Sequence, residues 1–236
     1  MSLSGGLLWH GRAWLSRALW QQTCEQISDW LHQVQPHSKE LLLIGASAGW
    51  MMPNGWLQGF EKVTTWDIDP MAARLFRWRH AAALQASGTQ LRCQTGDALA
   101  SLANLLPAHP KACILFDNVL GQYRFHCRDV AHAAEEIARI VATVRGREWG
   151  SLHDTFSGPA QSLLPSGVIP PMHSSIRGPQ SDAAADQTQL ARLGAKGKWL
   201  DHLTASVFDT GTRVHHIAWP YQTHYWHCLQ AGWVKN

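Results

Sequence analysis

The chain has 236 residues, of which 45% are hydrophobic, so it can bury one large core, and a second full domain is not expected. Its formal net charge is +3 with 14 histidines counted as neutral, far from the concentrated basic surface of a nucleic-acid-binding protein. One basic cluster, Arg74, Arg77 and Arg79 around Trp78, lies in a helical pattern where charges usually mark a solvated face. We therefore expect a small-molecule partner and no nucleic acid.

The five cysteines form an odd set without a CxxC pair or the spacing of a zinc site. They indicate reduced thiols, and hence a cytoplasmic protein with no bound metal. No run of about 18 apolar residues occurs, so neither export nor membrane insertion is indicated, and no membrane partner is expected.

The first 38 residues form a predicted helical extension. Apolar side chains recur there every three or four positions, at Trp20, Cys24, Ile27, Leu31 and Val34. Residues 40–50 (ELLLIGASAGW) are an apolar run ending in glycines, as in a strand buried on both faces before a tight turn. Residues 62–67 form a second strand, and a helix follows with Asp69 as its N-cap and Pro70 at its first position.

The strand-then-helix order continues through residues 90–106, and residues 111–121 supply a fourth strand. The clearest helix follows, with Val130, Ala133, Ile137, Val141 and Val144 on one face, and residues 148–158 form a fifth strand. Such alternation implies parallel pairing through right-handed crossovers. The predicted fold class is α/β: a doubly wound, mostly parallel seven-stranded sheet with helices on both faces.

The alternation of strands and helices ends in the last third of the chain. Prolines and glycines interrupt residues 158–200, which we interpret as a lid-like insertion with a helical pattern at 183–193. Two β-rich runs around DTGT (209–212) predict a C-terminal antiparallel hairpin. We thus expect one domain over 1–236, comprising the extension (1–38), a core (40–156), the insertion (158–200), and a hairpin and tail (201–236).

In an open parallel sheet, ligands lie beyond the carboxyl ends of the strands. In this chain, every position that follows a predicted strand is polar or glycine. These positions are Gly45–Gly49, Asp67, Asp97, Asp117 with Asn118, and His153 with Asp154. An irregular helix is expected after the first turn, because Pro53 and Gly55 oppose a helix interior.

The ordered segments LLLIGASAG, VTTWDIDP, TGDAL and LFDNVLG resemble the motif series of class I S-adenosylmethionine-dependent methyltransferases, over about residues 40–156. The resemblance implies S-adenosylmethionine as cofactor and S-adenosylhomocysteine as product. It implies that Asp67 binds the ribose hydroxyls and that Asp97 meets the adenine amino group, with Ala98 beside the ring. The full implied cofactor set is Gly45, Ala46, Ser47, Gly49, Asp67, Ile68, Asp97, Ala98, Asp117 and Asn118.

Two residues depart from the family pattern. Ser47 replaces the middle glycine of the GxGxG turn, and Leu43 stands where the family usually has an acid within the first strand. The second departure removes a partner for the cofactor's amino group. That contact must therefore come from backbone carbonyls or from Asp117.

A sulfonium methyl group is already a good electrophile, so the enzyme mainly has to align the acceptor and exclude water. If a base is needed, His153 with Asp154 beside it is the first candidate, and Tyr123 and His126 are others. The competing interpretation of His153 is a buried, hydrogen-bonded histidine. The tail residues His215, His216, Trp219 and Tyr221 could close an aromatic pocket over a small-molecule acceptor.

Several alternatives stay open at this point. Gly45–Gly49 could be a plain strand-to-helix turn, and Asp97 could be a helix cap. An aminopropyl transferase shares the fold, but it needs clustered acidic residues to bind a polyamine, and this chain has few after its fourth and fifth predicted strands. Metal-assisted hydrolysis is another alternative, but its candidate ligands are not spaced as in a recognised metal motif; they are His153, Asp154, His202, His215 and His216. A non-catalytic scaffold that binds the cofactor, and a homodimer, are further possibilities.

Overall fold

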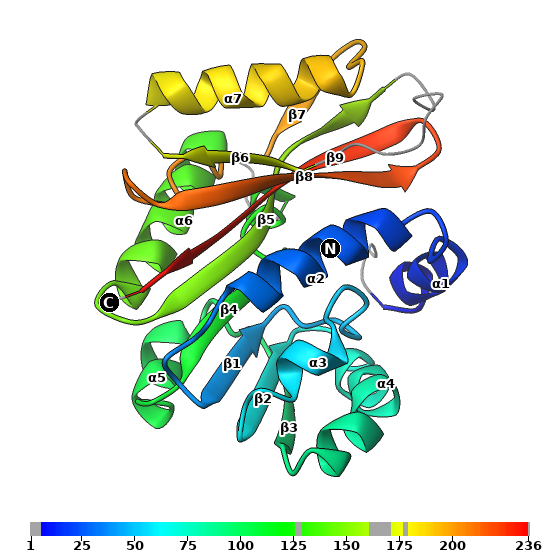
Figure 1. Cartoon of the computed structure of the whole chain (residues 1–236). Helices are drawn as coiled ribbons and strands as arrows, with labels where there is room; N and C mark the ends of the chain where they lie inside the picture. The colour runs from blue at the N-terminus through cyan, green and yellow to red at the C-terminus, as the bar shows by residue number, and fades with distance from the viewer. Residues whose placement is uncertain (1–5, 126–128, 161–170, 177–178, 236) are drawn as a thin grey trace.

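The computed structural model describes residues 6–125, 129–160, 171–176 and 179–235. One sheet runs through the molecule, and its first five strands lie in the order β3-β2-β1-β4-β5 (Figure 1). All neighbouring pairs among these five are parallel. Their bounds are Glu40–Ile44 (β1), Lys62–Asp67 (β2), Gln90–Thr95 (β3), Cys113–Asp117 (β4) and Trp149–Pro159 (β5). The predicted doubly wound arrangement is confirmed.

The sheet continues in antiparallel fashion beyond β5, through β9 (Tyr225–Val234), β8 (Arg213–Gln222) and β6 (Met172–Ser175). A short strand, β7 (Leu200–Asp201), pairs with the outer part of β5. The sheet therefore has nine strands where seven were predicted. The difference arises because the expected insertion at 158–200 supplies β6 and β7.

The C-terminal hairpin is confirmed, but its turn is not at DTGT. Strands β8 and β9 are joined after Gln222, whereas residues 209–212 make the turn that leads into β8, with Thr212 N donating to Asp209 O at 3.1 Å. The apolar residues before that turn, Val207 and Phe208, pack into the core and do not pair as a strand.

Helices cover both faces of the sheet. The face that carries the larger core cluster holds α2 (Gln21–Gln33), α3 (Asn54–Leu57) and α4 (Ala72–Ala86), while the opposite face holds α5 (Leu102–Ala108) and α6 (Val130–Val144). The remaining helices are α1 (Leu7–Leu15), the 3-10 turn η1 (Tyr123–Phe125) and α7 (Pro179–Arg192).

The start of α6 follows the sequence closely. The side chain of Asp129 accepts a hydrogen bond from Ala131 N at 3.0 Å, which satisfies one of the free amides of the first turn. Of the predicted apolar face, Val130 is 50% exposed and the other four residues are buried.

Helix α4 begins later than predicted. Asp69 Oδ1 accepts from Met71 N at 2.9 Å in a turn that precedes the helix, so Ala72 is the first helical residue. The irregularity expected after β1 is present, because α3 is a single short turn preceded by Pro53.

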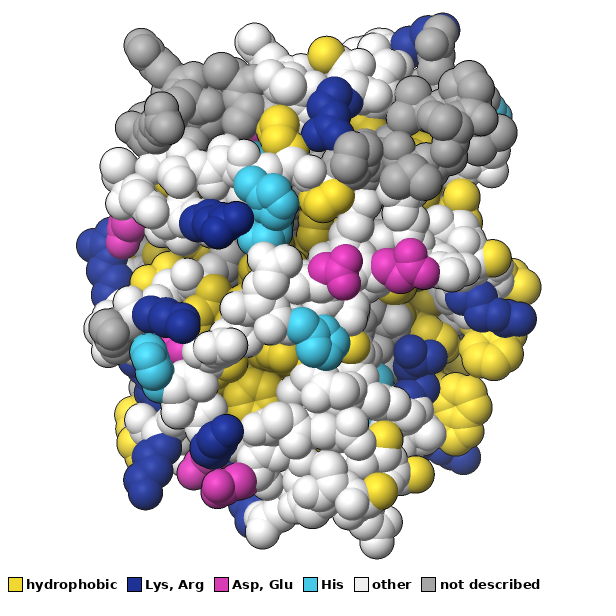
Figure 2. Space-filling view, viewed as in Figure 1, with side chains coloured by type: hydrophobic (Ala, Val, Ile, Leu, Met, Phe, Trp, Pro, Cys, Tyr) yellow, Lys and Arg dark blue, Asp and Glu magenta, His cyan; other side chains and the backbone are white. Residues whose placement is uncertain are grey.

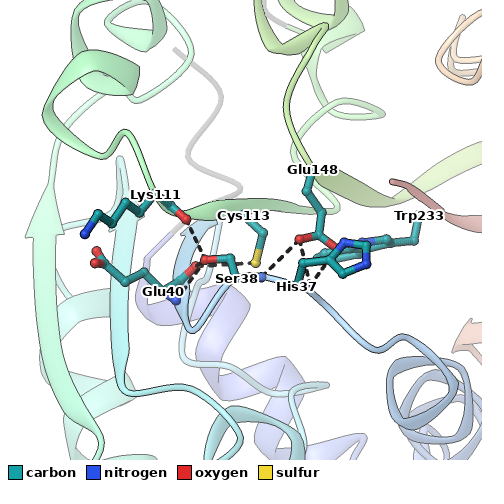
Figure 3. A network of polar contacts seen from close by, with 7 residues as sticks. All are labelled: His37, Ser38, Glu40, Lys111, Cys113, Glu148 and Trp233. Carbon is teal, nitrogen blue, oxygen red and sulfur yellow. Dashed lines mark hydrogen bonds and ion pairs between the residues drawn. The ribbon is translucent and has the colours of Figure 1, made fainter. Parts of the chain in front are cut away.

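The amino-terminal edge of the sheet is tied together by the carboxylate of Glu148 (Figure 3). It accepts hydrogen bonds from the backbone amides of His37 and Ser38 and from Trp233 Nε1, at 2.9–3.2 Å. Ser38 Oγ bridges to the backbone oxygens of Lys111 and Glu40. This network joins strand ends and lies at the edge opposite the expected ligand site.

Figure 2 shows scattered charges over most of this face and a concentration of apolar and basic side chains at the right-hand edge, over α1. Four cysteines carry free thiols, namely Cys24, Cys93, Cys113 and Cys228; Cys127 lies outside the described residues. Every described helix is too short or too polar to cross a bilayer.

Candidate functional site

The turn after β1 and the acid after β2 lie in direct contact. Ser47 N donates to Asp67 Oδ2 at 2.7 Å, and Asp69 N donates to Asp67 Oδ1 at 2.8 Å. Burial raises the pKa of Asp67, and these two backbone hydrogen bonds partly oppose that rise. The turn after β1 and the acid after β2 therefore meet at the carboxyl ends of their strands.

Gly45 and Ser47, both in the turn after β1, have positive φ angles. Gly45 has φ 77°, and a Cβ there would lie 2.8 Å from both Asp117 O and Val119 Cβ. Ser47, which replaces the family's middle glycine, adopts φ 48° without glycine's freedom. The turn is therefore packed tightly against the end of β4.

Helix α1 covers this turn. Trp9 Nε1 donates to Ser47 Oγ at 2.8 Å, while Gly6 N and His10 Nε2 both reach Asp69 Oδ2 at 3.0 Å. Trp50 Nε1 also donates to His10 Nδ1 at 3.1 Å. The N-terminal extension, predicted from the sequence only to be helical, thus contacts both the turn after β1 and Asp69.

Asp117 lies beside Gly45, on the same face of the sheet as Leu43. Leu43 pairs with Leu115, and Asp117 follows two residues later in β4, so its side chain points to the same side one pleat further on. Burial, and then repulsion from Asp67, raises the pKa of Asp117 to about 8. Among the described residues, nothing donates a hydrogen bond to its carboxylate.

Asn118, the residue after Asp117, links the end of β4 to β5. Asn118 has φ 52°, and its Oδ1 accepts from Asp154 N at 3.1 Å. A Cβ on Gly121 would lie 2.9 Å from Asp154 N and Cβ. Asp154 therefore sits just beyond the cofactor-facing end of β4.

Asp154 forms a dyad with a histidine from β9. His227 Nδ1 lies 2.9 Å from Asp154 Oδ1, and the rings of Trp219, Tyr221 and Tyr225 surround the imidazole at centroid distances of 4.9–5.6 Å. Burial alone would raise the pKa of Asp154, but the charge and hydrogen bond of His227 lower it below its ordinary value. The carboxylate is therefore ionised, and in the neutral tautomer that donates to it from Nδ1, His227 has its lone pair on Nε2.

A second polar chain flanks the dyad. His202 Nδ1 donates to Gly121 O at 2.7 Å, which leaves Nε2 to accept from Ser157 Oγ at 2.8 Å. Ser157 Oγ also lies 3.2 Å from Tyr225 OH. Burial lowers the pKa of His202, so its ring is neutral.

Asp154, His202 and His227 are also the described group best placed to hold a cation. Their ligand atoms lie within 4.8 Å of one another. Two histidines and one carboxylate are a ligand set that several metals accept. In the structure, however, all three side chains already hydrogen-bond to each other or to Ser157 and Gly121.

The predicted pairing of His153 with Asp154 does not occur. Adjacent strand residues point to opposite faces, and His153 is fully buried on the α6 face against Phe208, with Ser151 Oγ 2.9 Å from its Nδ1. Burial lowers its pKa to about 3. The buried interpretation of His153 fits this geometry better than the catalytic one.

Of the other predicted site residues, those that the structure describes make their contacts away from the dyad. Tyr123 OH donates to Glu136 Oε2 on α6 at 3.3 Å. His126 lies outside the described residues. His215 and His216 are buried beside β6, with His216 Nε2 2.7 Å from Ser174 Oγ.

Of the residues predicted to lie beside the adenine, Asp97 and Ala98 already make contacts within the protein. Asp97 Oδ1 accepts from Ala100 N at 2.9 Å and so caps the following turn. Ala98 is buried, whereas Ile68, next to the ribose acid, is 64% exposed. The adenine contacts therefore stay a prediction.

Two residues of the site were not singled out from the sequence, His227 and Trp9. Trp9 stacks on Tyr221 at 6.2 Å while bonding to Ser47, so α1 joins the turn after β1 to the aromatic side chains around His227. The sequence feature that could have pointed to His227 is the segment YWH at 225–227, which by itself predicts only a strand.

Comparisons with known proteins give a likeness in fold only. No protein-family model matches the chain, and no curated protein matches it. Magnesium protoporphyrin IX methyltransferase (ChlM) from Synechocystis PCC 6803, solved with bound SAH, is 15% identical over 90% of this chain and 82% of that chain, with a TM-score of 0.45. The glycopeptide N-methyltransferase MtfA, solved with S-adenosyl-L-methionine, is 13% identical over 90% and 94%, with a TM-score of 0.44.

A different kind of enzyme also matches. A putative Zn-dependent alcohol dehydrogenase from Rhodobacter sphaeroides is 15% identical over 55% of this chain and 46% of that chain, with a TM-score of 0.39. Likenesses at this level carry neither a family nor an activity to this chain. The function has to be argued from the site.

Proposed function

We propose that this protein binds S-adenosylmethionine in the crevice formed by the Gly45 turn, Asp67 and Asp117, and transfers its methyl group to a small-molecule acceptor held beside His227. The observation that carries the proposal is the 2.7 Å contact between Ser47 N and Asp67 Oδ2. It brings the motif after β1 and the acid after β2 to one point at the carboxyl ends of the parallel strands, where such sheets bind ligands.

The residues present fit the chemistry of the cofactor. A carboxylate offers about four acceptor positions, and Asp67 uses two for backbone amides, so each oxygen retains capacity for a ribose hydroxyl. Asp117 is a carboxyl group to which no described residue donates a hydrogen bond, and it lies on the same face of the sheet as Leu43, two residues further along the strands. It supplies the missing acceptor for the cofactor's ammonium group.

The acceptor side offers a general base. When bound, the cofactor supplies an electrophilic sulfonium methyl group. His227 Nε2 takes the proton from an acceptor hydroxyl or ammonium group, and ionised Asp154 stabilises the imidazolium that results. Trp219, Tyr221 and Tyr225 exclude water and suit an aromatic or planar acceptor.

Calorimetric titration with S-adenosylmethionine and S-adenosylhomocysteine tests the proposal. The wild-type protein should bind both, and Asp67→Ala should weaken binding by about 1–3 kcal/mol, since it loses hydrogen bonds to the ribose. Asp209→Ala, an exposed acid paired with Arg145, serves as the control and should bind normally.

Two results would count against it. If the wild type binds neither ligand, both the enzyme and a cofactor-binding scaffold are refuted. If Asp67→Ala binds as tightly as Asp209→Ala, the ribose assignment is wrong. Binding of both ligands without methyl transfer to any of a panel of phenols and amines would favour the scaffold.

A further inference from the structure

Helix α1 presents an apolar face to solvent. At about 100° per residue, Leu7, Leu8, Gly11, Trp14 and Leu15 fall within an arc of roughly 120°. Leu7, Leu8 and Leu15 are 71%, 76% and 83% exposed. The opposite face carries buried His10 and Ala13, so the inward contacts of α1 are already made by other residues. Among the described residues, only Trp14 of this outward face has ring contacts, and the three leucines stay exposed.

This face continues onto α4 and the end of β2. The rings of Trp14 and Trp78 lie 6.1 Å apart, and Trp78 is 65% exposed. At the other end, Gly6 N bonds to Asp69, so Leu7 and Ile68, which is 64% exposed, each adjoin one partner of this hydrogen bond. We call the set Leu7, Leu8, Trp14, Leu15, Ile68 and Trp78 the α1 patch.

The exposed charges along α1 and α4 are basic, while Asp67 and Asp69, which flank Ile68, accept hydrogen bonds from backbone amides. Residues 1–24 contain no Asp or Glu, and neither do residues 70–96. Arg12, Arg17, Arg74 and Arg77 are exposed there, with the Arg17 guanidinium 4.7 Å from the Trp14 ring centroid. Figure 2 shows this mixture of apolar and basic side chains along the edge over α1 and α4.

We propose that the α1 patch docks on the surface of an anionic lipid membrane. Leu and Trp side chains on a short helix rimmed by arginines match the boundary between headgroups and acyl chains, where apolar insertion and attraction to anionic headgroups act together. A self-associating two-fold interface is disfavoured because it would bring these arginines against one another. RNA is disfavoured because it offers nothing to bury the leucines.

The association is with the surface and involves no spanning segment. It replaces the sequence-based expectation of no membrane partner, which rested on the lack of a long apolar run. The lipid proposal does not rest on the proposed methyl transfer, since the α1 patch lies on the side of α1 that faces away from the turn after β1.

Co-sedimentation of the full chain with vesicles tests the proposal. The protein should bind phosphatidylcholine vesicles that contain phosphatidylglycerol, and bind pure phosphatidylcholine vesicles more weakly. Leu8→Ser combined with Leu15→Ser should lower the partition coefficient about tenfold or more, because two exposed apolar side chains no longer insert. Val130→Ser, which alters an apolar residue 50% exposed on α6, is the matched control and should bind as wild type.

The charge contribution is tested separately. Arg74→Gln should lower binding to the anionic vesicles by about fivefold and leave binding to neutral vesicles unchanged. Arg213→Gln, an exposed arginine at the start of β8, should change neither. Circular dichroism confirms that each variant is folded.

Three outcomes would overturn the proposal. Absence of sedimentation with anionic vesicles is one, and equal loss in the Leu8/Leu15 and Val130 variants is another. The third is a dimer, seen by light scattering, that the Leu8/Leu15 variant dissociates, because the α1 patch would then be an interface between copies of this chain.

Discussion

Replacing Asp117 with asparagine should change stability and ligand binding in opposite directions. The pKa of Asp117 is about 8 in the folded protein, against an ordinary value of 3.8. Between these two values the folded state binds more protons than the unfolded state, so stability falls as pH rises, by up to about 1.4 kcal/mol per pH unit. Asp117→Asn, which resembles the protonated acid, removes this dependence.

The magnitude is large enough to measure. From pH 5.5 to pH 8 the wild type should lose up to about 3 kcal/mol relative to Asp117→Asn, which is roughly 6–12 °C in Tm for a chain of this size. Thermal unfolding followed by circular dichroism across this range measures the difference. Asp209, whose side chain is 71% exposed, provides the control: the Tm of Asp209→Asn should change with pH as the Tm of the wild type does.

The same variant should bind S-adenosylhomocysteine about 10-fold to 150-fold more weakly, because a charged hydrogen bond to the ammonium group is lost. Methylthioadenosine lacks that group, so its affinity should be unchanged. Parallel Tm curves for Asp117→Asn and wild type would refute the buried-carboxyl argument. Equal loss for both ligands would show that Asp117 does not contact the ammonium group.

Three further changes address the turn, the base and the cation. Gly45→Ala should destabilise the fold by about 2–5 kcal/mol in urea unfolding, through strain at positive φ and contact with β4, whereas Gly88→Ala, with open space around it, should lose about 1 kcal/mol. Once an acceptor is identified, His227→Gln should lower kcat about 10²–10⁴-fold, and His153→Gln should change it only slightly; the reverse order would restore His153 as the base. Dialysis against EDTA should leave Tm unchanged and metal content substoichiometric, and a zinc-induced rise in Tm that His202→Gln abolishes would contradict this.

The parallel half of the fold was predictable because its signals are local. Continuous apolar runs such as Leu41–Ile44, each followed by glycine or an acid, identify buried strands and their ligand-facing ends. The contact between Ser47 and Asp67 follows from strand order, which the alternating pattern also implies. Strands β6 and β7 were missed because their few residues show no clear period.

The acceptor side was less predictable, because its dyad joins residues 73 positions apart. No local pattern pairs Asp154 with His227; the antiparallel register of β5 and β9 does so. The choice of His153 was avoidable in part, since a strand assignment already places neighbours on opposite faces. The role of α1 required coordinates, because its buried and exposed faces are both apolar.

Helix α1 touches the turn after β1 through Trp9 and carries the α1 patch on its other side. Any adenosyl ligand that shifts this helix must alter its partition into lipid, and lipid must alter the affinity for the ligand by the same factor. Through this nine-residue helix, ligand binding and lipid binding would each change the equilibrium constant of the other. The ligand affinity measured in dilute buffer would then differ from the ligand affinity at a bilayer.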